Sequence, residues 1–262
     1  MTKHVFMSSN FRNSSEMYLR LIAVVLCLLL LNACAPTATA VKGKVVPTQK
    51  DSNSINQLMK SDLDRVADLE LRENTQSLRT LMTKMYKRNP VELKKSTSDT
   101  VEKMVDWVFE GDHGWNFEML NNAQDLDAMY LAFKPEYKGD RVLAFIVGIQ
   151  TMMIKARGNK TEFYITDVVD PQSVYNTARN IEIAAWKLSN TRDENGNLYF
   201  LTNEMQAGKD QNLSFEREIG KMIGRTDLYA EVLAERSQRG ITKFTQGFAT
   251  KVFLPISIPF AR

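Results

Sequence analysis

The apolar run at residues 142–154 constrains the fold of this chain more than any other segment. Only Gln150 and Thr151 interrupt it with polar side chains. Gly139, a residue that ends helices, and Asp140, a residue that caps their start, precede it. Thirteen residues are too few to cross a bilayer, which needs about 20 helical residues. A helix of this length that is apolar on all sides is typical of a buried, central position. The alternative is a surface that inserts into lipid or into a partner.

Helical periodicity continues through the rest of the chain from about residue 54. Apolar residues recur at steps of three and four, the spacing of one helical face, in the segments 55–69, 78–85, 101–108, 126–133, 174–188, 215–223, 230–233 and 241–252. A polar patch at residues 72–76 separates the first two. The pattern predicts an all-α fold, mainly helical, with seven to eight helices and few or no short strands. Residues 163–165 and 198–201 are either short strands or extended connectors.

Capping and breaking residues set the expected helix ends. We expect starts at Asp99 with Glu102 as its capping partner, at Asn121 or Asn122, at Asp140, at Asp170 followed by Pro171, and at Ser214, and ends at Asn89-Pro90, at Gly111 and before Pro135. Gly220 and Gly224 allow either a close helix–helix contact or a break. Thr226-Asp227 resembles a new cap, which favours a break near Gly224 and a new helix from Asp227. Two prolines make residues 254–260 extended.

The first 33 residues have the layout of a secretory signal. Basic residues at positions 3, 12 and 20 precede an apolar stretch at residues 21–31, and small residues follow it. Eleven apolar residues fall well short of a membrane span, so a cleaved signal fits better than a transmembrane anchor. Translation can begin at Met1, Met7 or Met17, and nothing after residue 33 depends on that choice.

The tetrad Leu31-Asn32-Ala33-Cys34 closes this segment. It has an aliphatic residue at position −3, a small residue at −1 and then cysteine. In this it resembles the lipobox of bacterial lipoproteins. The resemblance implies that a diacylglyceryl group is attached to the sulfur of Cys34 and that the peptide is cut after Ala33. Because Ala35 rather than aspartate follows the cysteine, the resemblance also implies the outer membrane with the body facing the periplasm, or the cell membrane in a host with one membrane.

Removal of residues 1–33 leaves a nearly neutral chain. The removed segment holds three basic residues and one acidic residue, so 31 basic and 30 acidic residues remain. Nucleic-acid binding needs a strongly basic surface, so we expect no nucleic-acid partner. Cys27 leaves with the signal and Cys34 is the acylation site, which excludes an internal disulfide. His113 is the only remaining histidine, so Cys/His metal sites and iron–sulfur sites are excluded and we expect no cofactor.

The domain organisation follows from these segments. We expect a lipoprotein signal peptide at residues 1–33, a lipidated cysteine with a flexible tether at residues 34–53, and a helical domain at residues 54–262. Residues 35–53 are rich in Thr, Ala, Lys, Pro and Ser and show no apolar period. About 20 residues of coil have a root-mean-square span of roughly 25 Å. That span holds a folded body just clear of a lipid headgroup layer.

The best local candidate for chemistry is the loop from Glu110 to Trp115. It places Asp112 and His113 between two glycines, and a histidine beside a carboxylate can act as a general base. The competing interpretation is an ordinary helix-exit loop in which Trp115 and Phe117 plug the core. No pair of carboxylates stands out for glycan hydrolysis. We therefore assign no catalytic residue and keep His113 and Asp112 as weak candidates.

The sequence favours a non-enzymatic function. We expect a lipid-anchored scaffold or partner-binding module of the cell envelope, with the membrane and an envelope protein as its partners. One alternative is an envelope enzyme that acts on peptidoglycan or lipid through His113 and Asp112. Another is a carrier of a small apolar ligand, held in a cavity formed around residues 142–154.

Overall fold

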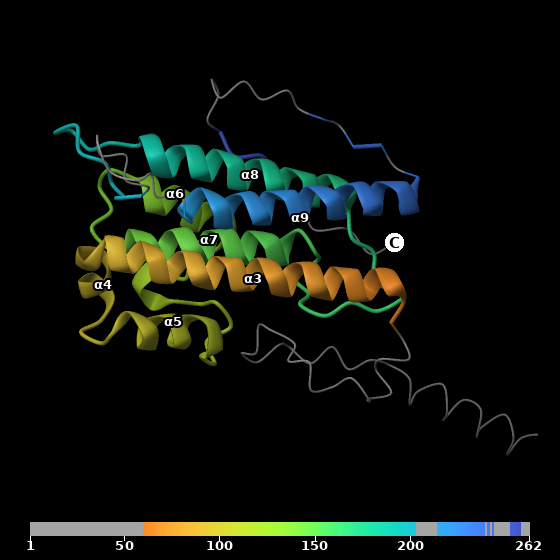
Figure 1. Ribbon diagram of the computed structural model, residues 1–262, viewed down its shortest axis with the longest axis horizontal. Helices are drawn as coiled ribbons and strands as arrows, with labels where there is room; N and C mark the ends of the chain where they lie inside the picture. The colour runs from red at the N-terminus through yellow and green to blue at the C-terminus, as the bar shows by residue number, and fades with distance from the viewer. Residues whose placement is uncertain (1–59, 203–213, 239, 242, 244–251, 258–262) are drawn as a thin grey trace, which may run out of the picture. The chain divides into compact units, whose positions relative to one another are not determined.

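The protein is a helical array in the part of the chain that the computed structural model describes, residues 60–202, 214–238, 240–241, 243 and 252–257 (Figure 1). Its α-helices are α3 (Asp62–Arg88), α4 (Pro90–Ser96), α5 (Val101–Glu110), α6 (Asp125–Phe133), α7 (Arg141–Lys155), α8 (Pro171–Asn190) and α9 (Ser214–Ser237), with a short 3-10 helix η2 (Glu118–Leu120) between α5 and α6. Among these residues there is no strand, and one isolated bridge pairs Arg192 with Leu198. The predicted all-α fold with seven to eight helices is confirmed. The predicted signal peptide, Cys34 and the tether lie outside the described residues.

Helices α3 and α9 run antiparallel along each other (Figure 1). Lys84 near the end of α3 lies 3.4 Å from the carboxylate of Glu218 near the start of α9. Further along, the hydroxyl of Thr226 on α9 donates to Glu70 on α3 at 3.0 Å. Helix α8 packs against α9, and α7 packs against both α3 and α6. The start of α3 and the end of α9 therefore lie at one end of the array, and α4 lies at the other.

Helix α7 forms the core, as the apolar run predicts. Its side chains from Arg141 to Met153 are all buried, including Gln150 and Thr151. Asp140 caps its start and accepts a hydrogen bond from the Leu143 amide at 3.0 Å. The alternative interpretation of this run as an exposed insertion surface is wrong. Gly148 lies at the crossing with α6, where Met129 leaves no room for a side chain.

The cap of α7 is itself buried, which predicts a pH effect on stability. Burial raises the pKa of Asp140 above its usual 3.8, although Ser96, the Leu143 amide and Tyr86 all hydrogen-bond to it. The folded chain therefore keeps this proton to a higher pH than the unfolded chain. The contribution of Asp140 to the free energy of unfolding then falls as the pH rises from about 3.8 through the folded-state pKa.

The comparison that isolates this effect is Asp140→Asn, which keeps a capping side chain and cannot titrate. We expect the urea midpoint of the wild type to fall relative to that of Asp140→Asn as the pH is raised from about 3.5 to about 7. The measurement uses the chain without residues 1–33 and with Cys34→Ser. A constant difference between the two midpoints across this range would contradict the prediction.

Two predicted helix starts are wrong. Thr100, not Asp99, caps α5, because its hydroxyl accepts from the Lys103 amide at 3.3 Å while Asp99 forms an ion pair with the Lys103 side chain. Helix α6 begins at Asp125. Asn121 and Asn122 instead follow η2 with φ of 52° and 56°, a left-handed backbone that asparagine tolerates and that ends a helix rather than starting one.

The predicted break near Gly224 is also wrong, because α9 is continuous from Ser214 to Ser237. The hydroxyl of Thr226 is buried and bound to Glu70, and Asp227 accepts from Arg179 on α8 at 2.5 Å, so neither residue caps a new helix. The close-contact interpretation of the glycines fails too, since no atom lies within 4 Å of a Cβ built on Gly220 or Gly224. Residues 163–165 and 198–201 form connectors and no strand.

Side chains of α8 hold the extended segment 252–257. Asn180 accepts from the Leu254 amide at 2.6 Å and donates to its carbonyl at 2.8 Å. Asn176 donates to the Pro255 carbonyl and Ser173 to the Ser257 carbonyl, each at 3.0 Å. The predicted extended end is confirmed as far as residue 257. Residues 244–251 of the last predicted stripe lie outside the described part of the chain.

Candidate functional site

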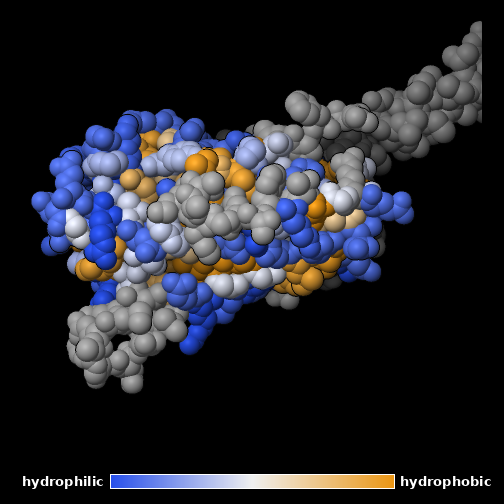
Figure 2. Space-filling model, turned by 90° about the horizontal axis from the view of Figure 1, so that it is seen from above, coloured by the Kyte–Doolittle hydropathy of each residue, from blue (hydrophilic) through white to orange (hydrophobic). Residues whose placement is uncertain are grey.

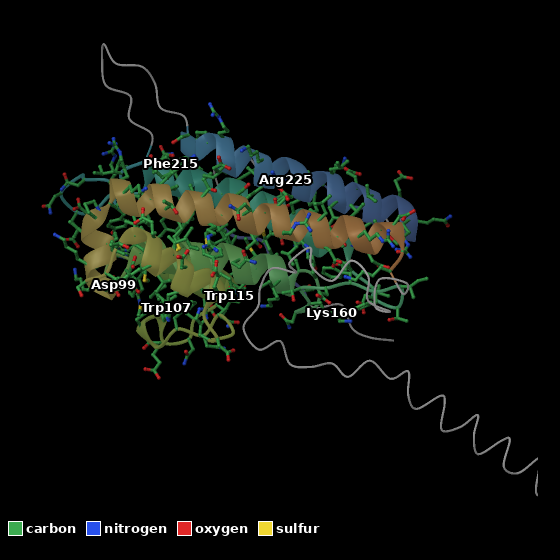
Figure 3. The ribbon with its side chains drawn as sticks, turned by 60° about the horizontal axis from the view of Figure 1, so that its bottom comes forward. Asp99, Trp107, Trp115, Lys160, Phe215 and Arg225 are labelled. Atoms are coloured by element: carbon green, nitrogen blue, oxygen red, sulfur yellow. The ribbon has the colours of Figure 1, made fainter. Side chains whose placement is uncertain are left out.

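An aromatic cluster forms where α5 ends. The ring of His113 lies 4.2 Å from that of Phe117 and 5.4 Å from that of Trp107, centroid to centroid. Trp115 stands edge-on to Phe109 at 5.4 Å. Trp115 and Phe117 are buried, which confirms that they plug the core, whereas Trp107 is 43% exposed. Figure 3 labels Trp107 and Trp115 in the same region of the molecule, and both rings contact Phe117.

His113 is held by the backbone on both sides of its ring. Its Nδ1 accepts from the Trp115 amide at 3.1 Å, and its Nε2 lies 3.0 Å from the Trp107 carbonyl oxygen. An amide N–H only donates and a carbonyl oxygen only accepts, so the ring carries its proton on Nε2. Both nitrogens are therefore used within the loop, and neither offers a free lone pair for a general base.

The loop depends on Gly111 for this close approach. A Cβ on Gly111 would lie 2.4 Å from the Trp107 carbonyl oxygen and 2.9 Å from the His113 ring. Asp112 lies exposed at the surface, and the ring nitrogens of His113 face the backbone of Trp107 and Trp115 rather than the Asp112 carboxylate. The two weak catalytic candidates are therefore neighbours in sequence, but the structure does not join them into an acid–base pair.

A buried ion pair joins α3 to the residues after α7. One oxygen of Glu70 binds the guanidinium of Arg157, whose side chain is fully buried. The other accepts from Asn74 at 2.5 Å and from Thr226 at 3.0 Å. Arg157 also donates to the Met153 carbonyl at 2.7 Å, and its guanidinium lies 5.4 Å from the Tyr229 ring. Every oxygen of the carboxylate is occupied, which suits a structural link between helices and leaves no free acid or base.

Sequence reasoning missed this network. Glu70, Asn74 and Ser77 continue the face on which Leu63 and Ala67 lie, and polar residues on an apolar face are the signal that could have revealed it. Their partners lie far away in the chain, since Arg157 follows Glu70 by 87 positions. Local periodicity cannot supply those partners.

Exposed apolar side chains gather in two further places. Val66 and Leu69 are exposed on α3, and Leu228 and Val232 are exposed on α9, the helix that packs against it. Ile165 and Val168 lie on the connector between α7 and α8. On the side where α8 lies, Figure 2 shows apolar residues in small separate areas among hydrophilic ones.

The described residues contain neither a candidate membrane span nor a metal-binding cluster. There, no helix combines the length and the apolar character that a bilayer crossing requires. In the same residues, no group of three or more His, Cys, Asp or Glu side chains is arranged to hold a metal ion.

Comparison with known proteins assigns no relative to this fold. No family model matches the chain, and neither the curated proteins nor the solved structures include a significant match.

Proposed function

We propose that this protein is a lipid-anchored module of the bacterial cell envelope that binds a protein partner and carries out no chemistry of its own. The lipobox-like tetrad ending in Cys34 supports the anchor. The observation that best supports a non-enzymatic function concerns His113. Both of its ring nitrogens are bound to backbone groups, so neither is free to act as a general base. The loop that contains the catalytic candidates forms an aromatic cluster on which the Trp107 ring packs.

The location follows from the residue after the cysteine. Ala35 favours transfer to the outer membrane in a host with two membranes, with the helical body facing the periplasm. In a host with one membrane, the same anchor holds the body at the outer surface of the cell membrane.

Trp107 is the proposed centre of the partner interface. Its ring rests on His113 and Phe117, so its conformation is fixed before a partner arrives. Arg79 pairs with Asp106, the residue before Trp107, and with Glu110 at 2.6 Å. An exposed tryptophan with a charged rim is typical of the few residues that dominate binding energy in an interface.

The test places a photoreactive amino acid at Lys103, one helical turn before Trp107, in the full chain expressed with its anchor. We expect one discrete crosslinked product in membranes. Trp107→Ala should weaken it by about 30-fold, the loss that corresponds to a binding hot spot of roughly 2 kcal/mol. The Cys34→Ser version should lose the product together with its acyl groups, which mass spectrometry of the N-terminus reports.

Leu228, an exposed apolar residue on α9, is the matched control position. A discrete product from a photoreactive group at Leu228, with none from Lys103, would move the interface to α9. An unmodified Cys34 in the wild-type chain would remove the anchor from the proposal. A His113→Ala protein that melts and crosslinks normally, yet fails to complement a deletion strain, would contradict the non-enzymatic function.

A further inference from the structure

A tight turn at residues 164–168 holds two apolar side chains out of the body. The Asp167 amide donates to the Tyr164 carbonyl at 2.8 Å, and the Asp167 carboxylate accepts from the Tyr164 amide at 3.0 Å. The same carboxylate pairs with Lys160. Ile165 is 61% exposed and Val168 is 69% exposed. The hydrogen bonds fix the turn, so these side chains project from a defined backbone.

The 164–168 turn is attached to the start of α3. The Phe163 amide donates to Asp68 at 3.0 Å, and Phe163 itself is buried in the core. Lys60, just before α3, pairs with Asp68 and places its ammonium 5.0 Å from the centre of the Tyr164 ring. Figure 3 shows Lys160, which pairs with the turn, at the end of the array opposite Asp99.

The short connection between Cys34 and the start of α3 indicates which surface lies near the 164–168 turn. Lys60 follows Cys34 by 26 residues, so a fully extended connection reaches at most about 90 Å. An anchor at Cys34 holds the start of α3 near the bilayer at a high effective concentration. The α4 end lies farther along the chain, beyond the whole length of α3.

We propose that Ile165 and Val168 insert into the lipid surface, so that the body docks on the membrane with the end where α3 begins. This inference rests on the anchorage at Cys34 in the proposed function. The carboxylate of Asp167, the acidic group in the turn, is already paired with Lys160. The pairing reduces the free-energy cost of bringing this carboxylate close to lipid. Two side chains bind lipid weakly by themselves, as a single acyl chain does, and the tether makes such weak binding effective.

The experiment uses the full lipidated protein with one introduced thiol. Cys34 is the only cysteine after residue 33, and acylation blocks its sulfur, so Val168→Cys gives a single labelling site. Val91→Cys is the matched control, since Val91 has the same side chain, is 67% exposed and lies beyond the far end of α3. From Asp68 to Arg88, α3 alone separates the two sites by about 30 Å, at ~1.5 Å per residue.

Both variants carry a bimane fluorophore in vesicles of phosphatidylethanolamine and phosphatidylglycerol that contain acyl-chain nitroxide lipid. We expect several-fold stronger quenching at position 168 than at position 91. Adding Ile165→Asp, a change at an exposed position, should abolish the difference without changing the melting temperature. Equal quenching at the two sites overturns the proposal. Protection of position 168 from aqueous iodide without nitroxide quenching also overturns it, because a protein contact then covers the turn.

The two proposals fail in distinguishable ways. A protein acylated at Cys34 that floats with vesicles but shows no quenching at position 168 keeps its anchor and overturns the docking. A protein without acyl groups overturns the anchorage and leaves Cys34, and Cys27 where the signal is retained, open to the label. A missing anchorage also overturns the docking, because two apolar side chains without a tether bind lipid too weakly to hold the body on the membrane.

Discussion

Replacing Arg157 by alanine should destabilise the protein by about 3–5 kcal/mol, the usual loss when one partner of a buried ion pair is removed. The change leaves the Glu70 carboxylate buried with two neutral donors, Asn74 and Thr226, and no positive charge. A domain is stable by only about 5–15 kcal/mol in total. The urea midpoint of the chain without residues 1–33 and with Cys34→Ser should therefore fall by a large fraction of its original value, or the unfolding transition should disappear.

Lys155 provides the matched control for Arg157. It lies two residues earlier in the chain and pairs with Asp125, but its side chain is one-third exposed. We expect Lys155→Ala to cost less than about 1 kcal/mol, because water screens this pair. The double variant Glu70→Gln/Arg157→Met removes both buried charges and should recover much of the loss. Similar losses for Arg157→Ala and Lys155→Ala, or a double variant as unstable as Arg157→Ala, would contradict the account.

The elements that the sequence predicts well are those with local causes. Asp140 before residues 142–154, and Asp170 before Pro171, start helices through contacts within three residues. A run that is apolar on all sides can only be covered by other helices, so the central place of α7 follows from composition and length. The number of helices and the absence of strands in the described ranges follow in the same way.

The elements that the sequence mispredicts are those decided by distant partners. Thr226-Asp227 has the composition of a cap, but Glu70 and Arg179 from two other helices use these side chains. Packing against these helices keeps α9 continuous through Gly224, although glycine has a weak helix preference. A short-range pattern has no means of showing that a polar side chain is already bound elsewhere.

The same limit applies to the candidate site. The sequence shows an acid, a histidine and a tryptophan in a glycine-flanked loop, and it correctly expects Trp115 and Phe117 in the core. It does not show that the His113 ring accepts from one backbone group and donates to another. That arrangement depends on left-handed backbone at Gly114 and Trp115, with φ of 57° and 62°. These angles turn the chain back onto the end of α5.

Gly148→Ala should destabilise the protein by about 1–3 kcal/mol, the usual cost of adding volume to a packed core. A Cβ on Gly148 would lie 2.6 Å from the Met129 Cγ and 2.9 Å from the Met129 backbone nitrogen. The side chain of Met129 can move, but the backbone nitrogen can move only if α6 shifts as a whole. Helix α6 must therefore move away from α7, and the core contacts between them weaken.

Gly224→Ala is the matched control, because the same substitution is expected to stabilise the protein at this position and to destabilise it at Gly148. Gly224 lies inside α9, is exposed and has no atom within 4 Å of a built Cβ. Alanine should therefore stabilise the helix there by about 0.5–1 kcal/mol, because it loses less backbone entropy on folding. Urea midpoints should move in opposite directions for the same chemical change at the two glycines. A stabilising Gly148→Ala would show that α6 does not pack on α7 at this crossing, and a destabilising Gly224→Ala would show that α9 is not continuous there.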